Sequence, residues 1–355
     1  MRKIWLDILT PKQFWLFTNV ADRLRSLGFH TLLTTREYEQ VTPLLKASGR
    51  DDIIVVGEYG GGSLYGKLRK SLERAVKLLN IVEAERPAAC ISFGSPEASR
   101  IAYGLGIPHI LVSDTPDSPV NRLAAPISTL IMTPWVINKS VWRRYGVPGG
   151  RVRLYRGLDP IAWLNRFSPD RSVLESHGLV ERRYVLVRSP EYKAAYLTGR
   201  FDLDRYVRFC RGLLYVCSGY DVVLLPRYSD EVEYLRNRLG EDVTIISQPV
   251  YGPSIIYYSA VLVGGGGTMT QEAALLGIPN ISFYPSQLPR PIKFLSNRGL
   301  VVVAEGLEEA IKAVGEMLAA LPVLRTRLSR IASSLVKGMD NPAVEISDAV
   351  EKLLR

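Results

Sequence analysis

Short runs of apolar, β-branched residues alternate with longer amphipathic stretches along the whole chain. Some runs, such as IIVV at 53–56, are apolar at every position. This is typical of strands in parallel sheets whose two faces are both covered by helices. In the first half we expect helices such as 14–27, 67–84 and 96–105 between strands at 4–9, 30–34, 53–56, 88–92, 109–113 and 129–132.

The same alternation restarts after a connector near residues 157–169. Strand–helix alternation of this kind predicts right-handed βαβ units and doubly wound parallel sheets. We therefore expect an α/β protein with two Rossmann-like domains facing a cleft, residues 1–160 and 161–340. An amphipathic helix within the segment 341–355 is expected to pack back on the first domain. The strands expected in the second half lie at 184–187, 222–225, 243–246, 260–263, 280–283 and 300–303.

Composition agrees with a folded protein, since 47% of the 355 residues are hydrophobic and 23% are charged. The formal net charge of +10 should attract anions such as phosphates or acidic lipid headgroups. A compositional habit of the source organism would explain the surplus equally well. Because the basic residues are scattered, with no five-residue basic run, the chain is not expected to bind nucleic acid.

Three cysteines without a CxxC motif indicate neither a disulfide framework nor a zinc site, so no metal is expected. Asp7 interrupts the apolar run at the N-terminus, and no small-residue cleavage site follows it. No stretch approaches the roughly 18 apolar residues that span a bilayer. We expect a cytoplasmic protein, with contact to the inner face of the membrane as a further option.

The strongest local signal is VGGGGTMTQEAALLGIP, in which an apolar strand ends at Val263 and a helix follows four glycines. Thr268 and Gln271 have the spacing of a capping box, which predicts that the helix starts there. Free N–H groups and the helix dipole attract phosphate, and Glu272 one turn on could accept hydrogen bonds from ribose hydroxyls. A tight strand–helix turn without a ligand is the alternative. The expected phosphate-binding residues are Gly265, Gly266, Gly267 and Thr268.

Other loops that follow strands supply further candidate ligand contacts. GGSLYGKL resembles a Walker A motif, but Leu68 stands where Ser or Thr must coordinate magnesium, which argues against an ATPase. We expect this glycine loop to line the cleft instead. Ligand contacts are expected from the loops after the first strands of both halves and from the QLPRPI turn; a solvated loop or rigid surface turn is the alternative. These candidates are Lys12, Gln13, Gly61, Gly62, Arg188, Ser189, Lys193 and Arg290.

Together, LDILTPKQFWLF, TTREYEQ, SFGSPEASRIAYGLGIP, SDTPDSPVNRL, MTPWVI and the glycine-rich segment resemble a largely archaeal family of uncharacterised, glycosyltransferase-like proteins. That family is similar to GT-B enzymes, in particular to the non-hydrolysing UDP-N-acetylglucosamine 2-epimerases. The resemblance implies a GT-B-like fold that binds a nucleotide-diphosphate sugar, UDP-linked, with the nucleotide on the second domain. It also implies that Glu272 meets the ribose and that the loop from Pro249 to Tyr251 lies near the base.

The same comparison argues against epimerisation, because most of the epimerases' acids and bases are missing. The second domain's first loop reads VRSPEYK, without a histidine, and the GSPE turn keeps Gly94 but no following aspartate. Asn121 and Arg122 in SPVNR match the epimerase pattern, but its two glutamates are absent. Proton abstraction at carbon needs such positioned groups. A metal-independent glycosyltransferase is therefore favoured over an epimerase, a hydrolase or a non-catalytic nucleotide-sugar-binding protein.

A glycosyltransferase must hold the leaving diphosphate and supply at most one base for the acceptor. Asp114 and Asp117 in SDTPDS are the best-placed candidates for that base, and Asp114 also stands where the epimerases carry a carboxylate. Glu97, near a helix start, is a third candidate. The alternative is that all three have only a structural role, because acidic residues are common in turns and in the first turns of helices.

The expected partners follow from this interpretation. They are a nucleotide sugar, a lipid or glycan acceptor, a membrane surface contacted peripherally, and a second copy of the chain in a homodimer. Five tryptophans, all within the first half, permit membrane contact, although core packing is the more usual use of tryptophan. No cofactor beyond the substrate is implied.

Overall fold

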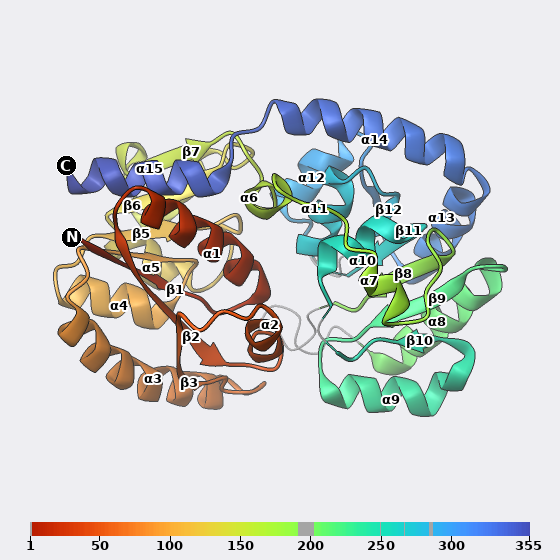
Figure 1. Cartoon of the computed structure of the whole chain (residues 1–355), viewed down its shortest axis with the longest axis horizontal. Helices are drawn as coiled ribbons and strands as arrows, with labels where there is room; N and C mark the ends of the chain where they lie inside the picture. Colours follow the sequence, from red (N-terminus) through yellow and green to blue (C-terminus); the bar gives the residue numbers. More distant parts are fainter. Residues whose placement is uncertain (1, 191–201, 249, 266, 284–286) are drawn as a thin grey trace. The chain divides into compact units, whose positions relative to one another are not determined.

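The structure is a computed structural model that describes residues 2–190, 202–248, 250–265, 267–283 and 287–355. The chain separates into two compact units. Unit 1 comprises Met1–Asn165 together with Met339–Arg355, and unit 2 comprises Arg166–Gly338. Each unit has its own sheet and its own hydrophobic core (Figure 1).

Among the described residues, unit 1 is built on a seven-stranded parallel sheet of order β3-β2-β1-β4-β5-β6-β7. All of its pairings are parallel, and the chain returns through helices between strands. The order reverses between β1 and β4, so the chain winds outward from the centre in two directions. Its strands are β1 (Lys3–Asp7), β2 (His30–Glu37), β3 (Ile53–Glu58), β4 (Ala89–Ser92), β5 (His109–Val112), β6 (Leu130–Pro134) and β7 (Val152–Tyr155).

Helices cover both faces of this sheet, as the continuous apolar strands require. Successive side chains of β1 point to opposite faces: Ile4 and Leu6 join one cluster, and Trp5 joins the other. The first cluster contains α1 and α15, and the second contains α3 and α4. The helices of unit 1 are α1 (Pro11–Ser26), α2 (Thr42–Ala47), α3 (Leu64–Glu85), α4 (Pro96–Gly104), α5 (Asn121–Ile127), α6 (Ile161–Leu164), α15 (Pro342–Leu354), and the 3₁₀ helices η1 (Lys139–Tyr145) and η2 (Gly149–Arg151).

The last helix, α15, belongs to the core of unit 1 although it follows all of unit 2 in the chain. Asn341 caps its first turn by accepting from the Ala343 amide at 2.8 Å. Ile346 and Val350 are fully buried in the cluster that also holds α1. The segment therefore completes one face of the first sheet.

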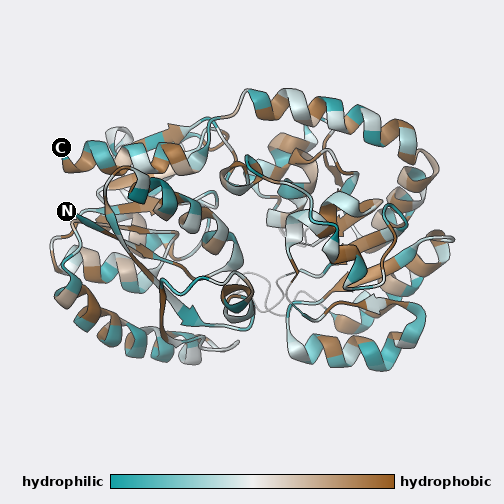
Figure 2. Ribbon diagram, viewed as in Figure 1, coloured by the Kyte–Doolittle hydropathy of each residue, from teal (hydrophilic) through white to brown (hydrophobic). Residues whose placement is uncertain are grey.

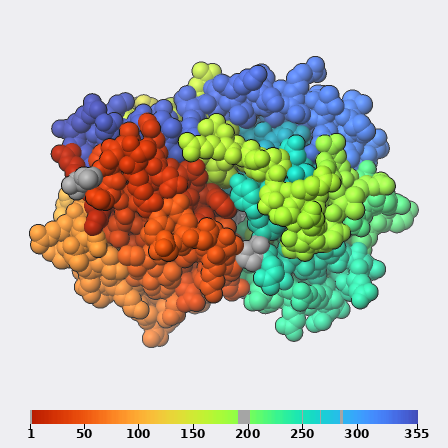
Figure 3. Space-filling model, viewed as in Figure 1, coloured from red at the N-terminus to blue at the C-terminus, as the bar shows by residue number. Residues whose placement is uncertain are grey.

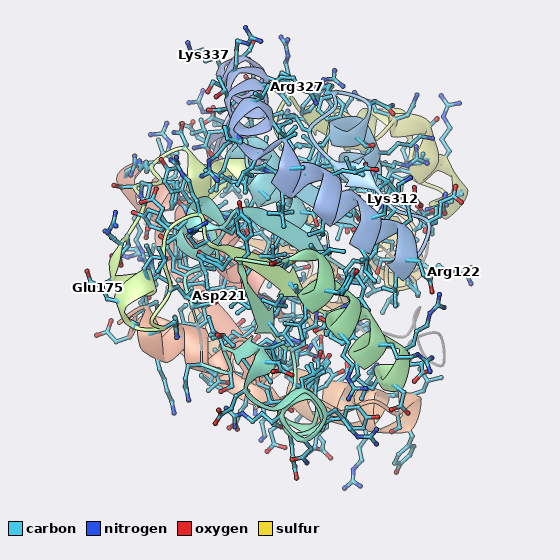
Figure 4. The ribbon with its side chains drawn as sticks, turned by 90° about the vertical axis from the view of Figure 1, so that its right-hand side faces the viewer. Arg122, Glu175, Asp221, Lys312, Arg327 and Lys337 are labelled. Atoms are coloured by element: carbon cyan, nitrogen blue, oxygen red, sulfur yellow. The ribbon has the colours of Figure 1, made fainter. Side chains whose placement is uncertain are left out.

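Unit 2 contains, within the described residues, a six-stranded parallel sheet of order β10-β9-β8-β11-β12-β13. Val185 and Val187 of β8 face the cluster of α8 and α13, whereas Tyr184 and Leu186 face the cluster of α10 and α11. Lys312, Arg327 and Lys337 on α13 and α14 are exposed (Figure 4). The strands are β8 (Tyr184–Arg188), β9 (Asp221–Leu225), β10 (Thr244–Ile245), β11 (Val261–Gly264), β12 (Asn280–Ser282) and β13 (Val302–Val303). The helices are α7 (Ser172–Glu175), α8 (Leu203–Val216), α9 (Ser229–Leu239), η3 (Gly240–Asp242), α10 (Gly252–Tyr258), α11 (Thr268–Leu275), α12 (Arg290–Ser296), α13 (Leu307–Ala319) and α14 (Leu321–Lys337).

The predicted α/β class with two doubly wound parallel sheets is confirmed, and each predicted strand has a counterpart. One strand was not predicted: β7, at the edge of the first sheet, reads VRLY and leaves Arg153 and Leu154 partly exposed. In the part of the chain that the structure describes, no helix is both long enough and apolar enough to cross a bilayer.

Candidate functional site

Both sheets have a switch point, where the loops after two neighbouring strands diverge and leave room for a ligand. In unit 1 this point lies between β1 and β4, and in unit 2 between β8 and β11. Several candidate residues from the sequence lie at these two places.

The site in unit 1 centres on Lys12, in the first turn of α1. Its Nζ lies 2.6 Å from Asp114 Oδ2 and 2.6 Å from Asp159 Oδ2, and 4.5 Å from the centre of the Phe93 ring. The Tyr155 hydroxyl donates to Asp159. We call Lys12, Asp114, Asp159 and Tyr155 the Lys12 cluster. Its members follow or end β1, β5 and β7, so the carboxyl edge of the sheet brings them together.

Burial sets the electrostatics of the Lys12 cluster. Desolvation alone would lower the pKa of Lys12, but the charges and hydrogen bonds of Asp114 and Asp159 outweigh it and raise that pKa. Desolvation and the nearby Asp114 charge raise the pKa of Asp159 in spite of its contact with Lys12. Burial also holds the pKa of Tyr155 well above its usual range. In the cluster, the ammonium group of Lys12 therefore lies between the carboxyl groups of Asp114 and Asp159, whose environments differ.

Backbone contacts fix the position of Lys12. The side chain of Thr10 caps α1 by accepting from the Gln13 amide. The Gln13 side chain accepts from the Leu9 amide at 2.7 Å and donates to the Phe93 carbonyl at 3.3 Å. Gln13 therefore ties the loop after β1 to the loop after β4. In this structure it is a structural support beside the Lys12 cluster.

Glu97 lies in a different buried network. Its Oε2 accepts from the Ser95 hydroxyl at 3.1 Å and lies 3.7 Å from Arg74 Nη1. Arg74 makes a two-pronged ion pair with Asp7, at 2.5 and 3.0 Å, and is 1% exposed. These contacts account for Glu97 without a ligand, and they separate it from the Lys12 cluster.

Asp117 also lies apart from Lys12. It forms an exposed ion pair with Arg144 at 2.7 Å and lines an open pocket of about 820 Å³ with Pro119, Arg122, Arg144 and Tyr145. Asn121, the residue before Arg122, is buried and donates to the carbonyls of Thr115 and Pro116. Asn121 thus shapes the SDTPDS loop, and the pocket presents Arg122 to solvent.

The glycine loop at Gly61 and Gly62 precedes α3. Ser63 caps this helix by accepting from the Gly66 amide at 3.0 Å. Gly61 has a φ of +72°, which favours glycine, and Gly62 is exposed. The loop lies at the carboxyl end of β3, the edge strand of the sheet.

The site in unit 2 centres on the turn from β11 to α11. The Gly265 amide donates to the Arg188 carbonyl at 2.9 Å, and a Cβ at Gly265 would lie only 2.6 Å from Pro190 Cγ. The backbone at Gly265 therefore packs closely on Pro190, just after the end of β8. Only glycine permits this approach.

The helix begins at Thr268 as predicted, but the predicted capping box is wrong. Gly267 is the N-cap residue, and no side chain caps α11. Thr268 stands one position too late to cap, and Gln271 Oε1 is buried without a hydrogen-bond partner among the described residues. The first amides of α11 therefore lack the side-chain acceptor that a capping box supplies.

Glu272, one turn into α11, is 3% exposed and reaches toward the start of α10. Its Oε2 would lie 3.6 Å from a Cβ at Gly252. Desolvation, aided by the negative charge of Glu272, raises the pKa of Tyr251 to about 12. Glu272 and Tyr251, predicted to meet ribose and base, are thus brought together by the packing of α10 on α11.

Arg188 ends β8, and its Nη1 donates to the carbonyls of Leu225 and Pro226 at 3.0 and 2.8 Å. Ser189 is fully buried, and its carbonyl accepts from Arg227 Nε at 2.9 Å. Arg290 is exposed at the first position of α12. Three further candidates, Lys193, Pro249 and Gly266, lie outside the described residues.

Asp159 and Tyr155 are cluster residues that sequence reasoning missed. Asp159 lies 147 positions from Lys12 in the sequence (159 − 12), and it follows the strand that was not predicted. A strand at 152–155 would have pointed to the loop after it, because loops after parallel strands meet at one edge of the sheet.

The sequence of this chain matches a known protein family over most of its length. A family model described as "Protein of unknown function (DUF354)" matches residues 2–330. The chain belongs to this family. An uncharacterised protein of Methanocaldococcus jannaschii is 24% identical over 325 residues, which cover 89% of this chain and 91% of that protein. The resemblance inferred from the sequence motifs is confirmed.

Solved structures confirm the GT-B-like fold. The UDP-N-acetylglucosamine 2-epimerase of Neisseria meningitidis, bound to UDP-N-acetylglucosamine, is 15% identical with a TM-score of 0.74, and 99% of each chain is covered. The M. jannaschii 2-epimerase, in complex with UDP-N-acetylglucosamine and UDP, is 15% identical with a TM-score of 0.72 over 89% of this chain and 92% of that one. The spinosyn forosaminyltransferase is 15% identical, with a TM-score of 0.64 over 100% and 99% of the two chains. At these identities the likeness establishes the fold.

Proposed function

We propose that this protein binds a nucleoside-diphosphate sugar, UDP-linked, and transfers the sugar without a metal ion. The observation that carries the proposal is the glycine turn at the switch point of unit 2. At this turn no side chain caps the start of α11, and the glycines leave the backbone accessible. The buried Glu272 lies one turn further along the same helix. Structures of the same fold hold UDP-N-acetylglucosamine or UDP, which supports this choice of ligand.

The diphosphate would bind at the start of α11. Its negative charge is favoured by the amides at the start of α11, where no side chain caps the helix, and by the positive end of the helix dipole. Arg188, fixed by two carbonyls at the end of β8, adds a positive charge beside the same turn. Glu272 would accept hydrogen bonds from the ribose hydroxyls, and Tyr251 would lie beside the base. These groups would stabilise the diphosphate as it leaves.

Asp114 is the proposed base for the acceptor hydroxyl. Its Oδ1 accepts from Thr115 Oγ1 at 2.9 Å and its Oδ2 contacts Lys12, so both oxygens are oriented. Each carboxylate oxygen has a further lone pair for an acceptor proton. Lys12 is paired with two carboxylates, and for this reason we assign it the positioning of Asp114 and not the binding of phosphate.

An isomerase acting on the same nucleotide sugar is the second candidate. It is favoured by one observation, the second carboxyl group at Asp159, because proton removal and return at carbon needs both a base and an acid. The raised pKa of Asp159 suits an acid.

Titration calorimetry with UDP, GDP and CMP tests the binding step. We expect UDP to bind, and Glu272→Gln to weaken binding by about 1–3 kcal/mol, the usual cost of losing a charged hydrogen-bond partner. Glu233→Gln, on the exposed surface of α9, is the matched control and should bind like the unaltered protein. Equal affinity in both variants would remove the nucleotide site from α11.

Incubation with labelled UDP-sugars separates the reactions. Label that stays inert until an acceptor is added indicates a transferase, whereas an altered sugar without acceptor indicates an isomerase. Asp114→Asn should abolish turnover and leave UDP affinity unchanged. Asp117→Asn, which removes a neighbouring exposed carboxylate, is its control. Full turnover of Asp114→Asn would exclude Asp114 as the base.

A further inference from the structure

Helix α3 of unit 1 has two apolar faces, of which only one is used by the fold. Leu78 and Val82 face the core, and the buried Arg74 on the same side pairs with Asp7. A surface helix ordinarily presents polar residues on its opposite face. On α3 that face is apolar, and brown segments recur along the helix in Figure 2.

The exposed residues follow one line along the helix. Their spacing of three or four positions places them one above the other on the helix surface. Leu64 adds an exposed apolar side chain at the first position of α3, at 76% exposure. We call the following set the α3 stripe: Tyr65 (75% exposed), Leu68 (60%), Leu72 (60%), Val76 (65%) and Leu79 (41%).

The α3 stripe is too large to be incidental. Scattered exposed apolar residues are normal, but contiguous apolar patches mark surfaces that meet another molecule or a membrane. The helix has 22 residues, so at 1.5 Å per residue it is about 33 Å long. The stripe covers most of that length; the segment that contains α3 lies at the lower left of the view in Figure 3.

Ile54 extends this surface onto the sheet. Val56 belongs to the core cluster beneath α3, and Ile54, two positions earlier on β3, points to the same face of the sheet. It is 42% exposed on an edge strand. The exposed apolar surface therefore includes residues of both α3 and β3.

The surface around the α3 stripe carries more positive than negative charge. Apart from the buried Arg74, its charged residues between 64 and 83 are Lys67, Arg69, Lys70 and Lys77 against Glu73 and Glu83. With Glu58 of β3, which pairs with Lys70 at 3.0 Å, four positive and three negative charges leave a net charge of +1. Leucine and tyrosine on one face with lysine and arginine beside them is the composition of helices that lie in a membrane interface.

We propose that the α3 stripe docks this protein on an anionic lipid bilayer, with α3 lying parallel to the membrane plane. The leucines and Val76 enter the boundary between headgroups and acyl chains, Tyr65 lies at headgroup level, and the basic residues pair with lipid phosphates. A second copy fits less well, because a two-fold interface repeats the same patch and would bring like charges together. This proposal does not depend on the proposed nucleotide-sugar chemistry.

The tryptophans suggested by the sequence do not form this surface. Trp5 and Trp142 are fully buried, Trp163 is 4% exposed, and Trp15 and Trp135 are partly buried. Trp5, Trp142 and Trp163 are therefore core residues, and the exposed apolar surface on α3 is the better candidate for membrane contact.

Cosedimentation of the full chain with vesicles tests the proposal. One set contains equal parts of phosphatidylglycerol and phosphatidylcholine, and the other contains phosphatidylcholine alone. We expect binding to the anionic vesicles that weakens as salt rises. Replacing Leu68, Leu72 and Val76 together by Gln should lower the partition coefficient roughly tenfold or more, because three buried apolar contacts are lost.

Two exposed residues of unit 2 supply the matched control. Tyr215→Gln with Val323→Gln removes side chains that are 88% and 77% exposed, and it should bind vesicles like the unaltered protein. Glutamine is a good helix former, so the triple variant should keep its melting temperature. As a second variant, Arg69→Gln with Lys77→Gln should weaken binding to anionic vesicles only.

The oligomeric state, measured by sedimentation velocity without vesicles, completes the test. A monomer that binds anionic vesicles through the α3 stripe supports the proposal. Failure to bind anionic vesicles, or equal binding by the triple variant, overturns it. A dimer that dissociates in the triple variant, without vesicle binding, would assign the same surface to a second copy and also overturn it.

Discussion

Acidification should destabilise unit 1 through His109, at the start of β5. The ring is 1% exposed, and each of its nitrogens lies 2.9 Å from a serine hydroxyl oxygen. The Ser128 hydroxyl already donates to the Ala124 carbonyl, so its oxygen accepts from His109 Nδ1–H. Nε2 then accepts from the Ser92 hydroxyl. This arrangement satisfies a neutral imidazole.

Burial lowers the pKa of His109 from 6.5 to about 4. Between these values the unfolded chain binds a proton that the folded chain does not, so folding stability is full above pH 6.5 and falls toward pH 4. The difference of 2.5 (6.5 − 4) corresponds to about 3 kcal/mol at 1.36 kcal/mol per pKa unit. This is a large part of the 5–15 kcal/mol or so that stabilises a typical domain.

Urea unfolding at several pH values between 4 and 7, followed by circular dichroism, measures the effect. His109→Gln keeps a side chain that can hydrogen bond but does not titrate, and every other acid and base is common to both proteins. The stability difference between the native protein and the variant should therefore shrink by about 3 kcal/mol as the pH falls from 6.5 to 4. A difference that stays constant across this range would refute the assignment.

Three substitutions test other contacts. Arg74→Met leaves Asp7 charged and buried without its partner, and we expect about 3–5 kcal/mol lower stability by urea titration. Gly265→Ala forces a Cβ against Pro190; a loss of about 1–3 kcal/mol and weaker UDP binding by calorimetry are expected, and unchanged values would contradict the close packing at that turn. Lys12→Met should lower the melting temperature at pH 7, and the deficit should shrink above pH 10.5, where the pair's contribution is lost as pH rises through the raised pKa of the lysine.

The parallel strands were the easiest feature to predict from the sequence. Runs such as those of β8 and β11 are apolar because helices cover both faces of the sheet, and this burial shows directly as composition. Edge strands carry a weaker signal. β7 pairs with only one neighbouring strand, and its middle residues, Arg153 and Leu154, are partly exposed, so its sequence pattern cannot be told from that of a loop.

The candidate site was predictable only in part. Gly265 and Thr268 follow a strand and precede a helix, so local sequence places them at the ligand edge. The Lys12–Asp159 contact depends on the order of strands in the sheet, which residue patterns do not encode. The prediction of a capping box was wrong for a local reason. The spacing of Thr268 and Gln271 fits a capping box, but the helix begins one residue earlier than that box requires, so Gly267 is the N-cap residue.

The return of α15 to unit 1 bears on how the chain folds during synthesis. Every residue of unit 2 leaves the ribosome before α15 does, so the second sheet can close its core while the first still lacks Ile346 and Val350. Until then the apolar side of α1 has no cover from that helix. A nascent or truncated chain that ends before residue 342 would therefore carry a finished unit 2 beside an unfinished unit 1, which would be the part recognised by chaperones and proteases.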